Sequence, residues 1–189
     1  MEHEPLALPT LHAGDAFTLR AWRMTDLDLV REAAADPYIP LVTTVPAQYD
    51  EQAGRAFVER QWAKAERGAY PFAVVRRADE RPVGFLGLWP KEDGRGSLGY
   101  WTVASARGQG VAGQALRAAA DWALGELGLA RLELYIEPWN TGSLRTAEVA
   151  GFRQEGLLRA WQTVGDERRD MYVYSLLATD VRPQPEPEP

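Results

Sequence analysis

The chain has 189 residues, 46% hydrophobic and 25% charged, which suits one globular domain with a single core. It has no cysteine, which excludes disulfides, thiolate metal sites and a catalytic cysteine, and its two histidines, His3 and His12, argue against a zinc site or a serine–histidine relay. The net charge of −6 argues against non-specific binding of nucleic acid.

The two ends of the chain differ in character from its middle. Residues 1–15 contain prolines, and we expect them to form a flexible arm. The start of the chain also lacks the basic region and apolar core of a secretion signal. Residues 16–180 should form the single domain, and the Pro/Glu-rich residues 181–189 a disordered tail. No run approaches the ~20 apolar residues of a membrane span. We therefore expect a soluble, cytoplasmic protein without a membrane partner.

Helix and strand signals fill the middle of the chain. An alternating, β-rich run predicts a strand over 17–22. Thr25 or Asp26 as N-cap and Pro37 as stop signal predict a helix over 25–36. Further helices are predicted over about 50–67, 110–124 and 141–150, and further strands over 70–76, 81–89, 97–103, 131–137, 152–164 and 168–177. This order describes a mixed α/β fold rather than a doubly wound one.

A glycine-rich turn, Arg107–Ala112, lies between a predicted strand and an alanine-rich helix. The first N–H groups of a helix are unpaired and carry positive partial charge, so glycines that let a ligand approach them predict a phosphate site. Gly108, Gly110 and Gly113 also fit the G-x-G-x-x-G pattern of dinucleotide folds, with Glu133 about 20 residues further on. Against NAD, a Rossmann domain begins with this unit, whereas here about a hundred residues precede it.

Three motifs occur in a compatible order around this turn: Gly99-Tyr100-Trp101, Arg107-x-x-Gly110-x-Ala112, and Asn140-x-x-Ser143-x-x-x-x-Glu148-x-x-Gly151-Phe152. Together they resemble the RimJ/RimL-like branch of the GNAT N-acyltransferase superfamily, whose pyrophosphate signature is Q/R-x-x-G-x-G/A. The resemblance implies an acyl-CoA-dependent N-acyltransferase. It also implies a mixed, mostly antiparallel sheet of six to seven strands with flanking helices. The two central parallel strands, 98–103 and 131–137, should splay apart into a V-shaped cleft.

Acetyl-CoA is the cofactor that the resemblance implies, with no metal. The residues it would contact are Trp101, Thr102, Val103, Arg107, Gly108, Gln109, Gly110, Val111, Ala112, Gly113, Asn140 and Ser143. Backbone N–H groups of 109–113 would bind the pyrophosphate, and unpaired backbone at the splay the pantetheine arm. A backbone N–H near Thr102 or Val103 would stabilise the oxyanion if that strand carries a bulge. Asn140 is equally suited to cap the helix after it.

The acid and base are less determined. Ser143 would hydrogen-bond the departing thiolate, or be an ordinary first-turn serine. Relatives often carry Glu two residues before the G-Y-W glycine, where this chain has Ser97. Glu137 is our candidate base, with Glu133, Glu92 or a water chain as alternatives and solvated surface charge as the simpler interpretation for each.

Aromatic residues supply the candidates for the acceptor pocket: Tyr38, Trp89, Tyr135, Trp139 and Trp161, with the proline-bearing segment 38–47. Plain packing is the alternative for each, and Trp22, Trp62, Trp101 and Trp122 are predicted core residues. The expected acceptor is a primary amine, on a protein N-terminus or a small molecule, and the protein a monomer or homodimer. A catalytically idle acyl-CoA-binding module and a succinyl-CoA-using enzyme remain the alternatives.

Overall fold

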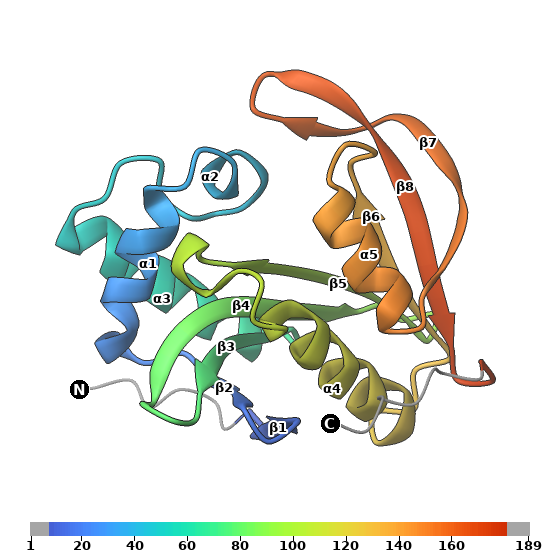
Figure 1. Cartoon of the computed structure of the whole chain (residues 1–189), viewed down its shortest axis with the longest axis horizontal. Coiled ribbons are helices and arrows are strands. Elements are labelled where there is room, and N and C mark those ends of the chain that lie inside the picture. The colour runs from blue at the N-terminus through green and yellow to red at the C-terminus, as the bar shows by residue number, and fades with distance from the viewer. Residues whose placement is uncertain (1–7, 181–189) are drawn as a thin grey trace.

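One eight-stranded sheet organises the protein, with helices on both of its faces (Figure 1). The computed structural model describes residues 8–180, so the predicted tail 181–189 and the first seven residues of the predicted arm lie outside the described residues. The strand order is β1-β2-β3-β4-β5-β6-β8-β7, and all neighbours are antiparallel except the parallel pair β5 and β6. The mixed, mostly antiparallel architecture is confirmed, with more strands than the six to seven predicted.

The strands are β1 (Leu11–Ala13), β2 (Phe17–Ala21), β3 (Tyr70–Arg76), β4 (Arg81–Pro90), β5 (Arg95–Thr102), β6 (Arg131–Ile136), β7 (Arg153–Val164) and β8 (Glu167–Leu177). The helices are α1 (Leu27–Ala34), α2 (Ile39–Val42), α3 (Glu51–Glu66), α4 (Val111–Gly125) and α5 (Thr141–Val149), with 3₁₀ turns η1 (Met24–Asp26) and η2 (Ala104–Ala106). Each long element predicted from the sequence is present within a few residues of its predicted bounds.

The N-terminal part departs from prediction in three places. Residues 11–13 form β1 on β2, with Ala13 fully buried, so this part of the predicted flexible arm is an edge strand. The helix predicted over 25–36 begins as a 3₁₀ turn. Asp26 is the N-cap residue of α1, one of the two predicted, but its carboxylate makes no cap bond to α1 and instead accepts from Arg20 and from the Arg23 N–H at 2.8 Å. A short helix, α2, also forms after Tyr38, with Pro40 in its first turn, where a missing N–H costs nothing.

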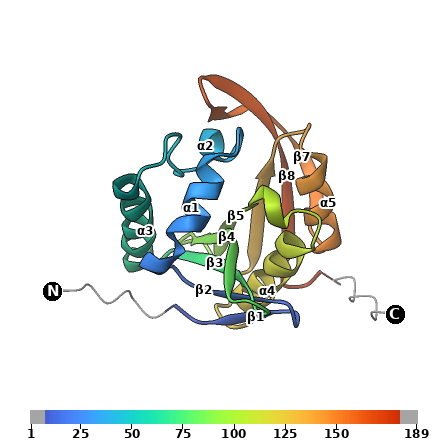
Figure 2. The ribbon, with the colours of Figure 1, turned by 60° about the vertical axis from the view of Figure 1, so that its left-hand side comes forward.

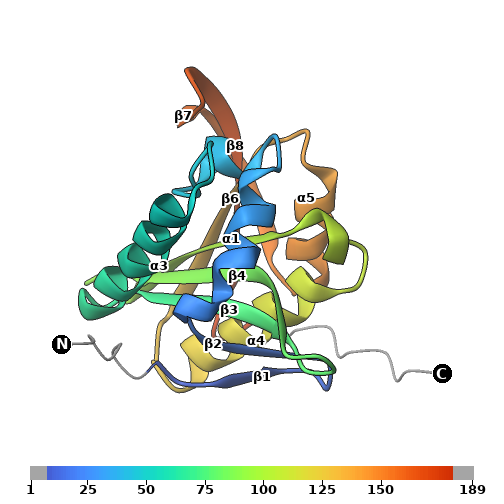
Figure 3. The same cartoon turned by 90° about the vertical axis from the view of Figure 1, so that its left-hand side faces the viewer.

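Two helical layers sandwich the sheet. Figure 2 shows α1 and α3 on one side of the central strands and α4 and α5 on the other, and Figure 3 keeps this separation from a third direction. Strands β3 and β4 are buried along almost their whole length, as expected for strands covered on both faces. Trp22, Trp101 and Trp122 are buried and Trp62 is half-buried, as predicted.

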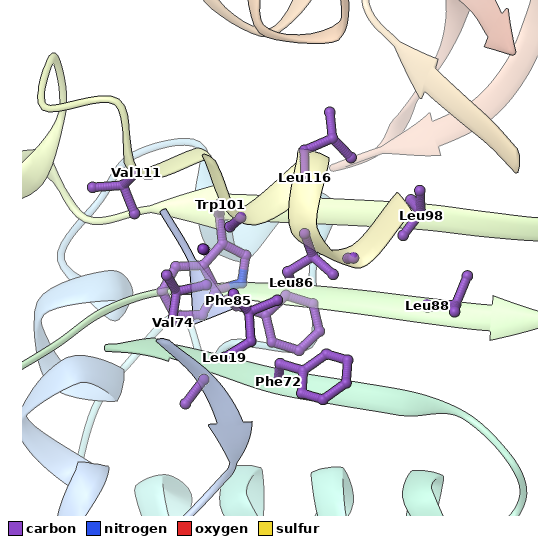
Figure 4. Packing of buried hydrophobic residues seen from close by; sticks show 14 of the residues in the cluster. Leu19, Phe72, Val74, Phe85, Leu86, Leu88, Leu98, Trp101, Val111 and Leu116 are labelled. Carbon is purple, nitrogen blue, oxygen red and sulfur yellow. The ribbon is translucent and has the colours of Figure 1, made fainter. Parts of the chain in front are cut away.

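Side chains of β5 alternate between the two layers. Trp101 packs with Trp22 and Phe85 on the side of α1 and α3. The next residue towards the N-terminus, Tyr100, reaches α5 on the opposite side. Figure 4 shows part of the core, with Leu116 of α4 lying over strands of the sheet. The middle of β5 therefore contributes side chains to both faces of the molecule.

Candidate active site

β5 and β6 separate after a short parallel pairing. Only Arg95–Ser97 pair with Arg131–Glu133, and beyond these residues β5 continues on β4 while β6 continues on β8. The predicted splay between the two parallel strands is therefore confirmed. It leaves one edge of β5 without a neighbouring strand, so its backbone N–H and C=O groups there are available to a ligand.

Strand alternation decides which backbone groups of β5 face this gap. The Val103 N–H donates to the Val83 carbonyl at 3.2 Å, so in the antiparallel ladder Val103 and Trp101 direct their backbone groups at β4. The backbone groups of Leu98, Tyr100 and Thr102 then face the gap. The backbone groups of Trp101 and Val103 therefore do not face the gap, although the Trp101 residue lines the cavity described below.

β5 carries no bulge in its pairing with β4, the condition under which a donor near Thr102 or Val103 was expected. Its register with β4 runs without a shift from Gly84 opposite Thr102 to Pro90 opposite Gly96. A regular ladder has no displaced N–H, so an oxyanion donor on this strand must come from the set that faces the gap. Val103 is excluded, because its N–H is already bonded.

The glycine-rich turn presents an open helix N-terminus. Gly108 and Gly110 both have φ of +75°, a left-handed conformation that favours glycine. The first hydrogen bond of α4 runs from the Gln114 N–H to the Gly110 carbonyl at 3.0 Å, so the N–H groups of 111–113 have no intrahelical acceptor. A Cβ added at Gly108 or at Gly113 would meet no atom within 4 Å. Space above these amides is open, as an anion site requires.

Arg107, predicted to add charge to this turn, is held by the chain itself. Its guanidinium donates to the Asp36 carboxylate at 2.6 Å and to the Thr102 carbonyl at 3.1 Å. Burial alone would raise the pKa of Asp36, but hydrogen bonds from the Tyr38 and Ile39 backbone and from Arg107 hold that pKa below its ordinary value. Arg107 therefore ties the glycine-rich turn to the start of α2, and its charge is shared with Asp36.

A cavity of about 410 Å³ lies beside the splayed strands. Its lining comes from helices α3 and α5, from the segment that contains α2, and from strands β4, β5 and β6. Its wall includes Ser97, the position where relatives often carry Glu, as well as the half-buried Tyr100. Only two charged side chains among the described residues line it, Glu137 and Lys64. The cavity is therefore mostly apolar, with one anion and one cation on its wall.

Glu137 is buried, with 4% of its surface exposed, directly after β6. Its carboxylate accepts a short hydrogen bond from the Tyr38 hydroxyl, and the Arg169 guanidinium lies 4.0 Å away. Burial, together with the hydrogen bond to Glu137, raises the pKa of Tyr38 well above its ordinary value, so this tyrosine remains a donor at neutral pH. Glu137 is thus a buried carboxylate facing the cavity, and the solvated-surface interpretation is wrong for it.

The start of α5 forms the wall beside β5. The Asn140 side chain accepts from the Ser143 N–H at 3.2 Å, so Asn140 is the N-cap of α5, one of the two roles considered for it. Tyr100 donates its hydroxyl to the Ser143 carbonyl at 3.2 Å, and burial raises the pKa of Tyr100 to about 12 despite that hydrogen bond. Ser143 and Tyr100 both line the cavity, so two hydroxyl groups lie on the same wall.

This arrangement matches known proteins. The family described as "Acetyltransferase (GNAT) domain" matches residues 16–153 of the chain. The chain belongs to the GNAT acetyltransferase family. As a GNAT acetyltransferase it is an enzyme, and its sheet, splay and glycine-rich turn are those of the family fold.

Relatives of this GNAT protein carry similar descriptions. It is 26% identical over 166 residues to the "Uncharacterized N-acetyltransferase p20" of Bacillus licheniformis, covering 86% of this chain and 93% of that protein. It is 33% identical over 116 residues to the "Probable N-acetyltransferase YjcK" of Bacillus subtilis, covering 59% of this chain and 63% of that protein. The crystal structure of Mycobacterium smegmatis RimJ, in complex with CoA-disulfide, is 26% identical with a TM-score of 0.78, covering 92% of this chain and 88% of that chain. The RimJ/RimL-like resemblance is thereby confirmed.

Glu133, a second candidate base, is engaged elsewhere. It is buried under Arg131, Lys91 and Arg95 and accepts from the Tyr135 hydroxyl at 2.9 Å. Burial would raise the pKa of Glu133, but these donors hold it below its ordinary value. The structure thus places Glu133 in an ion-pair network outside the cavity lining, and a dinucleotide-ribose role finds no support. Glu92 is exposed on the turn between β4 and β5, also outside that lining.

The five aromatic acceptor candidates divide into two groups. Tyr38, Trp89 and Tyr135 line the cavity. Trp139 and Trp161 do not, and are instead largely exposed. Trp139 packs edge-on against Tyr38 with centroids 4.9 Å apart, and Trp161 stacks on Tyr135 at 5.5 Å. Each therefore supports a cavity residue from outside.

Sequence reasoning missed Lys64 and Gln61, which line the cavity from α3. Gln61 is fully buried and donates to the Phe57 carbonyl at 3.0 Å, which directs its side-chain oxygen at Lys64, 3.3 Å away. Burial, reinforced by the charge of Arg60, lowers the pKa of Lys64. The sequence did contain a signal for these two residues. Gln61 and Lys64 are polar, lie three residues apart and interrupt the otherwise inward-facing side of the predicted helix.

No helix within residues 8–180 is long and apolar enough to cross a membrane. The same part of the chain contains no group of three or more His, Cys, Asp or Glu side chains positioned to hold a metal ion.

Proposed function

We propose that this GNAT enzyme transfers an acetyl group from acetyl-CoA to a primary amine by direct attack in a ternary complex. The observation that carries the proposal is continuity: the open N-terminus of α4 lies at the end of the splayed edge of β5, and that edge leads into a cavity with a buried carboxylate. The N-terminus of α4 would thus bind the phosphates, the unpaired edge of β5 would bind the pantetheine arm, and the cavity would hold the thioester and the amine.

The donor would lie along β5. Backbone N–H groups of 109–113 would bind the pyrophosphate, with Gly108 and Gly113 leaving room for it. The pantetheine arm would pair with the gap-facing backbone of β5, and the RimJ relative bound to CoA-disulfide supports CoA as the ligand. Leu98 and Tyr100 face the gap and also line the cavity, which makes their N–H groups the candidates for the oxyanion donor. Thr102 faces the gap but lies outside the cavity lining.

The chemistry follows from the groups on the cavity wall. The amine lone pair attacks the thioester carbonyl, an N–C bond forms, the C–S bond breaks, and the amine loses one proton. Glu137 would take that proton, with Tyr38 and Arg169 stabilising its negative charge. The departing thiolate would accept a hydrogen bond from the hydroxyl of Ser143 or Tyr100, both of which line the cavity. Ser97 supplies no carboxylate, so Glu137 would serve as the base in this enzyme.

Release of CoA from acetyl-CoA, measured with a panel of primary amines, tests the proposal. We expect turnover with at least one amine. A Gly110→Val variant should bind CoA at least about tenfold more weakly, because a β-branched residue is strained at φ +75° and its side chain narrows the approach to the amides. Tight CoA binding without acyl transfer to any amine would contradict the proposed reaction. Substituting succinyl-CoA for acetyl-CoA in the same assay decides the acyl group.

A further inference from the structure

The cavity carries one cation, Lys64, that the transfer reaction does not use. Its ammonium group lies 3.3 Å from the Gln61 side-chain oxygen and 3.4 Å from the Thr44 hydroxyl oxygen, both neutral acceptors. Within residues 8–180 it forms no ion pair, and the only charge that perturbs it is the like charge of Arg60. A half-buried ammonium without a counter-ion is an unfavourable arrangement unless a ligand supplies the negative charge.

Gln61 and Thr44 orient this ammonium towards the cavity. Gln61 is fixed by its own hydrogen bond to the Phe57 carbonyl one turn earlier in α3. The Arg60 guanidinium donates to the Thr44 carbonyl at 2.9 Å, which ties the segment after α2 to the same face of α3. The cation is therefore held from two elements, and Arg60 adds positive potential beside it.

The second charge in the lining, Glu137, comes from a different part of the fold. Figure 1 shows α3 and β6 well separated, at the left and the right of the molecule. A ligand that satisfies both charges carries a positive or proton-donating amine at Glu137 and an anion at Lys64. Between them the lining is apolar and aromatic, with Phe57, Phe85 and Trp89. A cavity of about 410 Å³ is of the size that binds small molecules.

We propose that the amine acceptor is an amino-carboxylic acid, whose carboxylate pairs with Lys64 while its amine lies at Glu137. This inference rests on the proposed function and names its substrate class. A charge-assisted hydrogen bond between carboxylate and ammonium in a partly desolvated site discriminates strongly against the uncharged amide. Lys64 is on this view a specificity residue that touches the substrate and takes no part in proton transfer.

Acetyl transfer to matched acceptors tests the proposal. 4-Aminobutyrate, 5-aminopentanoate and 6-aminohexanoate are each compared with the uncharged amide and with the corresponding alkylamine, all with acetyl-CoA. Acceptors of this kind are used because the separation of α3 and β6 requires an amine and a carboxylate several bonds apart. Wild type should prefer a carboxylate-bearing acceptor by about 10- to 100-fold in kcat/KM. Lys64→Met should abolish that preference by raising KM for the carboxylate acceptors alone, with kcat changed less than about threefold. Lys64→Arg should retain part of it.

Arg67→Met is the matched control, because it removes one positive charge from the end of the same helix at an exposed position outside the cavity. It should leave the preference intact. Equal use of carboxylate and amide acceptors by wild type, or equal losses for both in Lys64→Met, would overturn the proposal while the acetyltransferase function stands. If no amine is acetylated, calorimetric binding of the amino acids to the CoA-loaded protein decides: binding that requires Lys64 supports the inference, and its absence refutes it.

Discussion

The Trp89 side chain on the cavity wall packs over two glycines on neighbouring strands. Gly87 of β4 lies opposite Gly99 of β5, and the Trp89 ring covers both. A Cβ added at Gly87 would lie 2.5 Å from Cη2 of Trp89 and 2.8 Å from Cζ of Phe85. A Cβ at Gly99 would lie 3.3 Å from the Trp89 ring, a much milder contact. We therefore predict a graded effect, with Gly87→Ala severe and Gly99→Ala mild.

The magnitude for Gly87→Ala follows from two opposing terms. Overpacking a close-packed site costs about 1–3 kcal/mol. Replacing glycine reduces the entropy of the unfolded chain, which offsets about 0.5–1 kcal/mol. A contact of 2.5 Å favours the upper part of that cost, about 2–3 kcal/mol, so the net destabilisation is about 1–2.5 kcal/mol, or a fall in Tm of about 2–10 °C for a chain of this length. Because Trp89 must shift, acceptor KM should also rise, whereas CoA affinity should stay within about twofold.

Thermal and urea unfolding of Gly87→Ala and Gly99→Ala, with steady-state kinetics, measure these effects. Trp89→Leu provides the matched background, since it removes the ring atoms nearest the new methyl group. Gly87→Ala should cost less stability there than in wild type, a coupling of at least about 0.5 kcal/mol. A Gly87→Ala protein as stable as wild type, with unchanged acceptor KM, would refute the reasoning.

Three further predictions concern titratable groups of the site. Glu137→Gln should lower kcat by about 10²- to 10⁴-fold. Tyr38→Phe, which removes only a hydrogen bond to that carboxylate, should lower kcat by about tenfold or less. A stopped assay of CoA release measures both, and a wild-type kcat in Glu137→Gln would exclude Glu137 as the base. Glu133→Gln should instead destabilise the fold by about 1–3 kcal/mol in urea unfolding, because it leaves the surrounding cations without their buried counter-ion. Its kcat should stay within about twofold of wild type. A kcat loss as large as that of Glu137→Gln would identify Glu133 as the base instead. The pKa of Tyr100 is about 12 in the fold and about 10 when unfolded, so the unfolded state loses its proton first and the free energy of unfolding falls as pH rises from 10 to 12. Tyr100→Phe should show a shallower fall over that range, Tyr174 retaining its own share, and equal slopes from urea titrations would contradict the assignment.

Much of the fold, and the conformation of the glycine-rich turn, could be predicted because they depend on local sequence. The glycines at 108 and 110 adopt the left-handed conformation that only glycine adopts without strain, and the helix start follows directly from them. The hydrophobic runs of β3 and β4 fixed their character as strands covered on both faces. The helix N-cap at Asn140 is likewise a relation between residues three apart.

The errors arose where a side chain finds its partner far along the chain. Asp26 is the N-cap residue of α1 as predicted, but its carboxylate bonds to Arg20 on β2 and to the Arg23 N–H rather than to the helix. The oxyanion donor was predicted near Thr102 or Val103, and the Val103 N–H is already bonded to the Val83 carbonyl. Local patterns predict what a residue can do, and strand pairing decides which of its groups remain available.

The sequence by itself indicated the family, through three motifs in a fixed order, and that resemblance implied the splayed sheet. The glycine-rich turn could be predicted directly, because residues close together in the chain specify it. Only the tertiary structure decided which charges face the reaction. Tyr38 and Glu137 are 99 residues apart and meet at the cavity wall. Glu133, four residues before Glu137, instead lies where β6 still pairs with β5, and cations from several segments hold it in an ion-pair network. Lys64 likewise gained its place in the cavity from the packing of α3 against the segment after α2. Burial at the cavity wall, which cannot be read from local sequence, gives these two charges their proposed roles.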